Sequence, residues 1–451
     1  MLRTLTTTAS TLALAVAAHA SDQPMSADDL QSALDAGGIV ELSGPVTTDQ
    51  TLTYEGTEPL VVIGNGHTIT MQANADIFAV TNGADLTMRG LTLRGTGGYS
   101  IENRGDADGS AGKGIFVQVP EAAIGTVSIT LEDVTVADVA NHGIHVSDCN
   151  LADACGSGGG GAGEGSAASI SVSISDVTVS GAGTGKFDAD GLRVDERGEG
   201  SIIFTASNST FENVGADGIE LDEGQAGDVI VTALALNAIT NGNYCDPAIL
   251  AAFLPSPDEA EFEEGAFAEA DVPAAVSGSP DDACIEREVS LYDDGSVEEY
   301  AFGLDLDDGF DIDEAGPGSI HAAFVSGDIT GNLDEGLDFD EEDAGDIRLS
   351  LNALSADGNT DDAVKLSEEG AGDVMASVFG GRVTGNGGKG YVFEEADAGD
   401  LFGSVTATEA RGNDDSDATG VEAVQEDDGS GMLAVAGDIS DGLDLDGVEL
   451  N

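Results

Sequence analysis

Six segments repeat one pattern: DGLRVDERGEGS from Asp190, DGIELDEGQAGD from Asp217, DGFDIDEAGPGS from Asp308, EGLDFDEEDAGD from Glu335, DAVKLSEEGAGD from Asp362 and KGYVFEEADAGD from Lys389. The second residue of the pattern recurs every 27 residues, as from Gly191 to Gly218 and from Gly309 to Gly336. A fixed period of this length indicates stacked units of one structure. Apolar and charged residues alternate inside each segment, which predicts a strand with one buried face. The repeat therefore predicts a solenoid built from such strands.

The alternation also predicts which side chains point inward. We expect Ile219, Leu221, Leu337 and Phe339 to lie in one continuous core. Their charged neighbours should face solvent, and these are Glu220, Asp222, Asp338 and Asp340.

An asparagine recurs 23 residues after the second position of the pattern, at Asn241, Asn332, Asn359, Asn386 and Asn413. Stacked amides could hydrogen-bond from coil to coil. Alternatively, asparagine is used there because it tolerates left-handed turn geometry. In both cases the asparagine marks a corner of the coil.

The repeat is too short for a propeller blade and lacks helical periodicity, which leaves a parallel β-helix. Together with VVIGNGHTITM from Val61 and TNGADLTMRGLTLRG from Thr81, it resembles the right-handed parallel β-helix proteins of the pectate-lyase-like superfamily. The resemblance implies an all-β fold over most of the chain. It does not imply one function, because the superfamily includes lyases, hydrolases, epimerases and adhesins.

Residues 1–20 combine Arg3, a short apolar run and the ending Ala18-His19-Ala20, which predicts a secretory signal peptide. We expect residues 21–451 to form a single β-helix domain with insertions near 148–168 and 244–300. A short helix from Ser26 to Ala36, ended by Gly37, should cap the N-terminal end of the solenoid. The protein is therefore expected to be secreted or periplasmic.

The chain contains four cysteines. In an oxidising compartment four cysteines typically form two disulfides, and three connectivities are open. Local pairing favours Cys149 with Cys155 and Cys245 with Cys284, against the alternative that some thiols are free.

The net charge is −72, from 86 acidic and 14 basic residues. This charge argues against nucleic acid and anionic membrane surfaces as partners, and the sequence gives no sign of membrane insertion. Halophilic adaptation, in which surface carboxylates hold water in salty surroundings, is one explanation of the acidity.

Equivalent outward positions of stacked coils should lie about 4.8 Å apart, so the acidic residues form carboxylate ladders. Calcium prefers several oxygen ligands and is the expected cofactor, if one is present. The expected metal ligands are Asp195, Asp217, Glu220, Asp222, Asp311, Asp313, Asp338 and Asp340. The alternative is that water and sodium screen the ladders without any specific site.

The ladders change from acidic to mixed in the first repeats, where His142, His145, Asp190 and Arg193 occur. A histidine could act as a base near neutral pH, and Arg193 could hold a carboxylate or a developing enolate. These four residues are the candidate catalytic group. The competing interpretation is an ordinary exposed strand edge with an ordinary ion pair.

Two hypotheses about function follow. The first is a secreted, cation-binding β-helix with a binding or structural role outside the cell, at a polysaccharide or a cell surface. The alternative is a calcium-dependent lyase or hydrolase of an acidic polysaccharide. The absence of Trp and the presence of only 6 Tyr disfavour sugar stacking. The sequence does not decide whether the protein is an enzyme.

Overall fold

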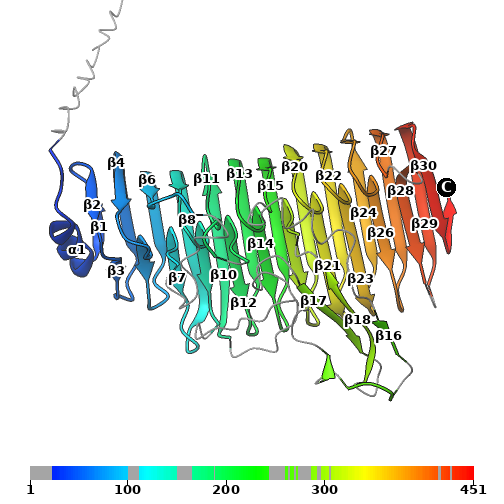
Figure 1. The fold of residues 1–451 in the computed structure, drawn as a ribbon, viewed down its shortest axis with the longest axis horizontal. Coiled ribbons are helices and arrows are strands. Elements are labelled where there is room, and N and C mark those ends of the chain that lie inside the picture. Colours follow the sequence, from blue (N-terminus) through cyan, green and yellow to red (C-terminus); the bar gives the residue numbers. More distant parts are fainter. Residues whose placement is uncertain are drawn as a thin grey trace, which may run out of the picture.

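The computed structural model describes residues 23–99, 111–149, 165–186, 188–242, 260–262, 265–268, 271–272, 286–291, 296–303, 306–414, 418–426 and 429–451. Within these residues the chain winds into a long stack of strands that runs from the N-terminal helix at one end to the C-terminus at the other (Figure 1). The expected signal peptide, residues 1–20, lies outside the described residues.

One long sheet carries sixteen of the described strands, joined by parallel pairing. They are β1 (Gly38–Glu41), β2 (Val46–Thr48), β4 (Leu60–Met71), β6 (Leu86–Arg94), β8 (Ile124–Ala137), β10 (Ala167–Ser175), β11 (Thr178–Ser180), β13 (Ile202–Glu212), β15 (Val229–Ile239), β20 (Ile320–Thr330), β22 (Ile347–Asp357), β24 (Val374–Phe379), β25 (Arg382–Thr384), β27 (Leu401–Arg411), β29 (Gly431–Ile439) and β31 (Val448–Leu450).

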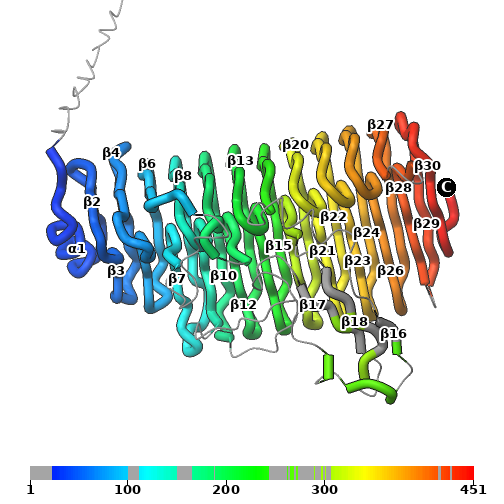
Figure 2. Tube along the Cα trace, viewed as in Figure 1, coloured from blue at the N-terminus to red at the C-terminus, as the bar shows by residue number. Residues whose placement is uncertain are grey.

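The second long sheet, which we call the repeat sheet, contains the six repeated segments. Its twelve described strands are β3 (Leu52–Tyr54), β5 (Phe78–Val80), β7 (Ile115–Gln118), β9 (Ile144–Ser147), β12 (Leu192–Glu196), β14 (Ile219–Glu223), β19 (Phe310–Glu314), β21 (Leu337–Asp343), β23 (Val364–Gly370), β26 (Tyr391–Glu395), β28 (Thr419–Gln425) and β30 (Gly442–Asp446). Each of these coils adds one strand to the repeat sheet and one or two strands to the first sheet, as β24 and β25 show. The tube drawing shows the coils stacked along the molecule (Figure 2). The predicted parallel β-helix is confirmed.

In the repeat sheet, residues that are 27 positions apart in sequence pair with one another in neighbouring strands. Leu192 of β12 pairs with Ile219 of β14, and Phe310 of β19 pairs with Leu337 of β21. Ile219 pairs with Phe310 although a long segment separates them in sequence, so the coils continue in register across the second insertion. The pattern therefore specifies one strand position in every coil.

The core lies between the two long sheets. Ile219, Leu221, Leu337 and Phe339 are all fully buried, as the alternation predicts. The predicted capping helix is α1 (Ala27–Ala36), in which the side chain of Ser26 accepts the backbone N–H of Asp29. Leu30 and Leu34 bury the helix against the first coil. Gly37 ends α1 at a positive φ of 68°, which costs glycine little.

The asparagines form the predicted amide ladder. The Nδ2 atom of each donates to the Oδ1 atom of the next, over 3.1 Å from Asn241 to Asn332, 3.0 Å from Asn332 to Asn359, 3.1 Å from Asn359 to Asn386 and 2.8 Å from Asn386 to Asn413. All five are buried. Each amide thus supplies a hydrogen-bond partner to a buried amide of the next coil, which water does not reach.

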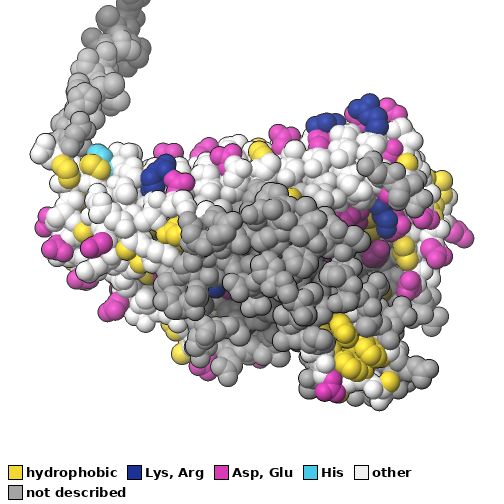
Figure 3. All heavy atoms as spheres, viewed as in Figure 1, with side chains coloured by type: hydrophobic (Ala, Val, Ile, Leu, Met, Phe, Trp, Pro, Cys, Tyr) yellow, Lys and Arg dark blue, Asp and Glu magenta, His cyan; other side chains and the backbone are white. Residues whose placement is uncertain are grey.

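Much of both expected insertions lies outside the described residues. In the second, β16 (Ala260–Glu261), β17 (Glu286–Leu291) and β18 (Val297–Gly303) form a small antiparallel sheet. On the face shown in Figure 3, hydrophobic side chains gather over this region, where Phe262 stacks on Phe267 at 4.2 Å between ring centroids. The single-domain organisation stays a prediction. So do both disulfides, because Cys155, Cys245 and Cys284 lie outside the described residues.

Candidate functional site

One outward row of the repeat sheet contains the expected catalytic and metal-binding positions. The parallel register aligns Phe116 of β7, His145 of β9, Arg193 of β12, Glu220 of β14, Asp311 of β19, Asp338 of β21 and Lys365 of β23. The row next to it aligns Ser147, Asp195, Asp222, Asp313, Asp340 and Ser367. Consecutive coils thereby place side chains that are far apart in sequence beside one another.

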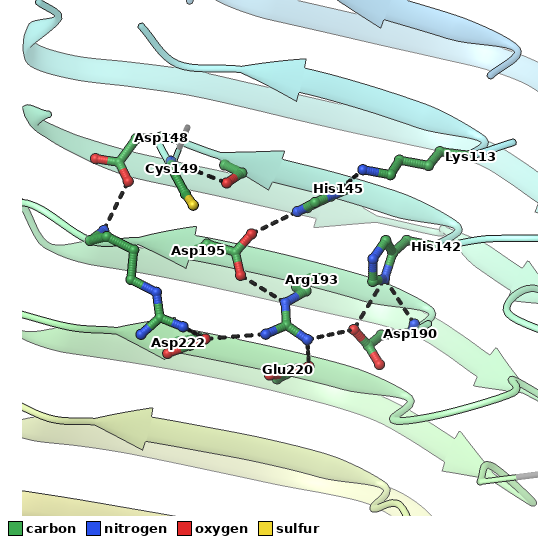
Figure 4. A network of polar contacts seen from close by, with 12 residues as sticks. Lys113, His142, His145, Asp148, Cys149, Asp190, Arg193, Asp195, Glu220 and Asp222 are labelled. Atoms are coloured by element: carbon green, nitrogen blue, oxygen red, sulfur yellow. Dashed lines mark hydrogen bonds and ion pairs between the residues drawn. The ribbon is translucent and has the colours of Figure 1, made fainter. Parts of the chain in front are cut away.

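His145 lies between a lysine and an aspartate (Figure 4). Its Nδ1 atom is 2.5 Å from Nζ of Lys113, and its Nε2 atom is 2.6 Å from Oδ2 of Asp195. Nε2 therefore carries the hydrogen that Asp195 accepts, and Nδ1 accepts from the lysine. Burial, followed by the charge of Lys113, lowers the pKa of His145 to about 3. The imidazole is thus neutral at physiological pH.

Lys113 is half-buried, and the face of Phe116 lies 4.5 Å below its Nζ atom. Burial lowers the pKa of Lys113 to about 8, although the charges of Asp76 and Asp195 oppose this shift. A lysine in this state exchanges a proton readily near neutral pH. Lys113, His145 and Asp195 therefore form a connected donor and acceptor chain.

Arg193 joins this chain to the next coil. Its Nε atom lies 2.7 Å from Oδ1 of Asp195, its Nη1 atom 2.5 Å from Oε2 of Glu220 and its Nη2 atom 3.2 Å from Oδ2 of Asp222. Arg197 also donates to Asp222. Each nitrogen of the Arg193 guanidinium therefore donates to a neighbouring carboxylate, and these carboxylates largely neutralise its positive charge.

His142 and Asp190 lie beside this chain. The backbone N–H of Asp190 donates to Nδ1 of His142 over 3.0 Å, and Oδ2 of Asp190 is 3.2 Å from the same nitrogen. Burial raises the pKa of Asp190 and lowers that of His142 well below its ordinary value. The rings of His142 and His145 are 4.5 Å apart. All four expected catalytic residues therefore meet in one cluster.

Carboxylates outnumber cations in this cluster, which we call the mixed-charge cluster. It contains Lys113, His142, His145, Asp188, Asp190, Arg193, Asp195, Arg197, Glu220 and Asp222. Burial alone would raise the pKa of Asp195, but Arg193 and His145 hold it well below its ordinary value. Burial raises the pKa values of Glu220 and Asp222 well above theirs, despite Arg193. The site thus combines one carboxyl whose pKa is lowered with two carboxyls whose pKa values are raised.

The expectation that the outward acids face solvent is wrong for three of the four. Glu220, Asp222 and Asp338 are only 6%, 1% and 8% exposed, whereas Asp340 is half-buried. They do point away from the core, as the alternation requires. Alternation determines the face of a sheet, but the groups lying over that face determine whether water reaches it.

Several repeated acids have a structural role. Oδ1 of Asp190 accepts the backbone N–H of Asp217 over 3.2 Å, and Asp217 accepts that of Asp308 in the same way. Along another corner, Asp346 accepts the backbone N–H of Asp373, and Asp373 that of Asp400, each over 2.9 Å. Asp217, an expected metal ligand, is therefore already used as a link between coils.

Three groups of described carboxylates have the geometry of a cation site, with ligand oxygens within 4.8 Å of one another. They are Asp188, Asp190 and Glu220; Glu220, Asp311 and Asp313; and Asp308, Asp334 and Glu335. Three converging carboxylate oxygens suit a hard cation such as calcium. Asp311 and Asp313 are half-buried, so an ion could reach the second group from solvent. These donors fit the expected cofactor.

The remaining expected ligands do not join these groups. Nζ of Lys365 lies 2.8 Å from Oδ2 of Asp338 and 3.8 Å from Oδ2 of Asp340. Asp195 and Asp222 are bound by His145, Arg193 and Arg197, which leaves them little capacity for a metal.

Sequence reasoning missed Lys113. The segment KGIFVQ from Lys113 is an earlier copy of the repeat, and Ile115 pairs with Ile144, which places Lys113 level with His142. The spacing of 29 residues, instead of 27, concealed it. Testing neighbouring periods around the first histidine would have found this lysine.

Comparisons with solved structures find other parallel β-helices. Tailspike protein 2 of an Escherichia coli O157:H7 bacteriophage is 12% identical, with a TM-score of 0.47, over 84% of this chain and 40% of the tailspike. The periplasmic alginate epimerase AlgG is 11% identical, with a TM-score of 0.44, over 96% of this chain and 84% of the epimerase. The A-module of the Azotobacter vinelandii mannuronan C-5 epimerase AlgE4 is 13% identical, with a TM-score of 0.39, over 94% and 92%.

These likenesses concern the fold alone. The chain spans 40% and 49% of the length of the two matching tailspike chains. No family model matches the sequence, and no curated protein matches it. Among the described residues, no helix has the length and apolar character needed to cross a membrane. The function of the chain therefore has to be argued from its own residues.

Proposed function

We propose that this protein is a cation-dependent lyase of acidic polysaccharides that acts outside the cytoplasm. The observation that carries the proposal is the chain of contacts from half-buried Lys113 through neutral His145 to ionised Asp195. The enzyme hypothesis therefore takes precedence over the structural hypothesis favoured by the sequence.

Lys113 is the base in this proposal. At its lowered pKa, about 8, a substantial fraction of the lysine is unprotonated in mildly alkaline water. His145 accepts a hydrogen bond from Lys113 and is held by Asp195, so it fixes the direction of the lysine amine. Arg193 in turn orients Asp195. Three buried side chains thereby position one base that solvent can reach.

The reaction that fits is β-elimination from a uronate. The lysine amine takes the proton from the carbon next to the uronate carboxylate. A double bond forms to the neighbouring carbon as the bond to the glycosidic oxygen breaks, and that oxygen takes up a proton from water. Carboxylates of the substrate make this carbon acidic only if their charge is neutralised.

Neutralisation is the difficulty for so acidic a protein, because Arg193 is already bound to Asp195, Glu220 and Asp222. A divalent cation at Glu220, Asp311 and Asp313 would supply the missing positive charge beside the substrate carboxylate. This group lies on the two coils that follow Arg193. The arrangement explains how acidic side chains and an acidic glycan can occupy the same face.

The test is a screen of the protein on alginate, pectate and other polyuronates, with calcium or with chelator. We expect unsaturated uronate ends, measured by ultraviolet absorbance, only with calcium. Lys113→Met should lower turnover about a hundredfold or more. Lys365→Met, which removes a lysine from the outward row of His145 and Arg193, should leave turnover unchanged. Activity that survives Lys113→Met would overturn the assignment of the base, and no cleavage of any polyuronate would overturn the lyase proposal.

A second candidate function is that of a cation-stabilised extracellular binding protein. The observation that favours it is the use of acids as links between coils, at Asp190, Asp217, Asp346 and Asp373. In that case calcium would stabilise the fold without any turnover, and the polyuronate screen would show binding alone.

A further inference from the structure

A row of glutamates runs through the inside of the solenoid, separate from the mixed-charge cluster. The last residue of the repeated strand pattern aligns Glu196 of β12, Glu223 of β14, Glu314 of β19, Glu341 of β21, Glu368 of β23 and Glu395 of β26. All six are 0% exposed. Because side chains alternate along a strand, this position faces the same way as the core residues. We call it the glutamate row.

Glu368 and Glu395, at the C-terminal end of the row, have no cationic partner among the residues that the structure describes. Both oxygens of each carboxyl are buried and lack any hydrogen-bond donor. The groups that act on Glu368 are the carboxyls of Glu341 and Glu395 and the backbone of Gly372. Those that act on Glu395 are the carboxyls of Asp397 and Asp373 and the backbones of Asp397 and Gly399. The backbone N–H groups of Gly372, Asp397 and Gly399 favour the ionised carboxyls, but burial outweighs their effect.

Packing leaves no room beside these carboxyls. A Cβ atom added at Gly372 would lie 2.7 Å from Oε1 of Glu368 and 1.3 Å from the carbonyl oxygen of Gly345. At Gly399 it would lie 3.1 Å from Oε1 of Glu395. A space too small for a methyl group does not accommodate a hydrated cation on that side.

The row itself contains a neutral member. Gln425 of β28 pairs with Glu395 and continues the same position in the next coil. Its Oε1 atom accepts the backbone N–H of Leu401 over 2.9 Å, and its Nε2 atom donates to the carbonyl of Glu426 over 3.1 Å. Glutamine has the shape of protonated glutamic acid, so this position accommodates the uncharged form.

We propose that Glu368 and Glu395 share protons at neutral pH, so that a carboxyl of one coil donates to a carboxylate of the next and makes the C-terminal coils sensitive to alkaline pH. Two ionised carboxylates at adjacent positions of a buried row would repel strongly, and burial favours the neutral form. A proton between them removes one charge and supplies the donor that both lack. These two residues lie apart from every candidate cation ligand.

The sign of the pH dependence follows from the direction of the shifts. Burial raises the pKa of Glu368 to about 8 and raises that of Glu395. A folded-state pKa above the unfolded value gives stability that is fully present below about pH 4.3. That stability is lost as the pH rises through the folded pKa. The C-terminal coils should therefore weaken between about pH 5 and about pH 9.

The experiment compares the full chain with Glu368→Gln, Glu395→Gln and the double variant, by melting temperature at about pH 5 and about pH 9. The wild type should lose a few degrees over this range, and the double variant should lose clearly less. Glu369→Gln, at an exposed neighbouring position, is the matched control and should retain the wild-type loss. At about pH 9 the double variant should also show slower hydrogen exchange than wild type in peptides from β23 and β26.

Two results would overturn the proposal. One is an equal loss of melting temperature in the wild type and in the double variant. The other is a double variant that melts lower than wild type by the same amount at both pH values. That result would mean that the two carboxyls are ionised and that their charge stabilises the fold. Hydrogen exchange in β23 and β26 distinguishes a local effect from titration elsewhere.

Discussion

The repeat sheet has two halves that use the same positions for different chemistry. From β9 to β14, the outward row contains His145, Arg193 and Glu220, and imidazole, guanidinium and carboxylates form a closed network. From β19 to β23, the same row contains Asp311, Asp338 and Lys365, and the lysine pairs with Asp338 and with Asp340 of the adjacent row. The backbone is equivalent in both halves, so the solenoid supplies a frame and individual side chains supply the chemistry.

The two halves are also stabilised in different ways. In the first half, cations hold buried acids, and removing one cation leaves several charges without a partner. In the second half, uncharged ladders such as Asn332 to Asn359 carry the contacts between coils. Four predictions test this difference, beginning with the largest effect.

Arg193→Ala should destabilise the protein by about 3–5 kcal/mol, because Asp195 and Glu220 would be left buried without their main cation, whereas Asp222 would keep Arg197. Lys365→Ala, in the same row, should cost about 1 kcal/mol or less, since its side chain is 27% exposed. Urea unfolding of both variants measures the difference. Equal losses would mean that the two halves do not differ in how charge stabilises them.

Asn359→Ala should cost about 1–3 kcal/mol. The substitution removes the acceptor for Nδ2 of Asn332, at 3.0 Å, and the donor to Oδ1 of Asn386, at 3.1 Å, where neither group meets water. Asn352→Ala, at an exposed position of β22, is the control and should change stability by less than about 0.5 kcal/mol. If both variants unfold alike, the ladder adds nothing to the second half.

The pH profile of turnover tests the chemistry assigned to the first half of the repeat sheet. If Lys113 is the base, turnover on a polyuronate should rise through about pH 8, because the unprotonated amine is the active form. At about pH 7 the rate should be roughly tenfold below its plateau. His145 should not add a second step near neutrality, since its pKa is about 3. A rate that falls across this range would contradict a lysine base.

Calcium should produce the smallest change. At a concentration about five times its Kd, a specific ion would stabilise the fold by about 1 kcal/mol, more than sodium at equal ionic strength. The double variant Asp311→Asn with Asp313→Asn should lose this gain, whereas Asp346→Asn should keep it, because Asp346 lies outside the three carboxylate groups. Identical melting in the two salts would favour halophilic solvation over a specific site.

The sequence predicted the fold and much of the candidate site. Alternation around Ile219 and Leu221 predicted the inward face, and the period predicted that His145, Arg193 and Glu220 lie in one row. Both inferences depend on backbone geometry, which is the same in every coil. Lys113 was missed because its coil has a different length, and the glutamate row was missed because Glu223 and its equivalents, which follow the alternating residues, were assigned to neither face.

The sequence by itself determined the solenoid, its register, its asparagine corner and the inward face of the repeated strands. These follow from residue spacing, since one period fixes one strand position in each coil. Only the tertiary structure decided that Glu220 and Asp222 are buried, that Arg193 is shared among several acids and that Glu368 and Glu395 lack a cation. Spacing orders residues along a face, whereas burial and pKa depend on every group that packs against that face.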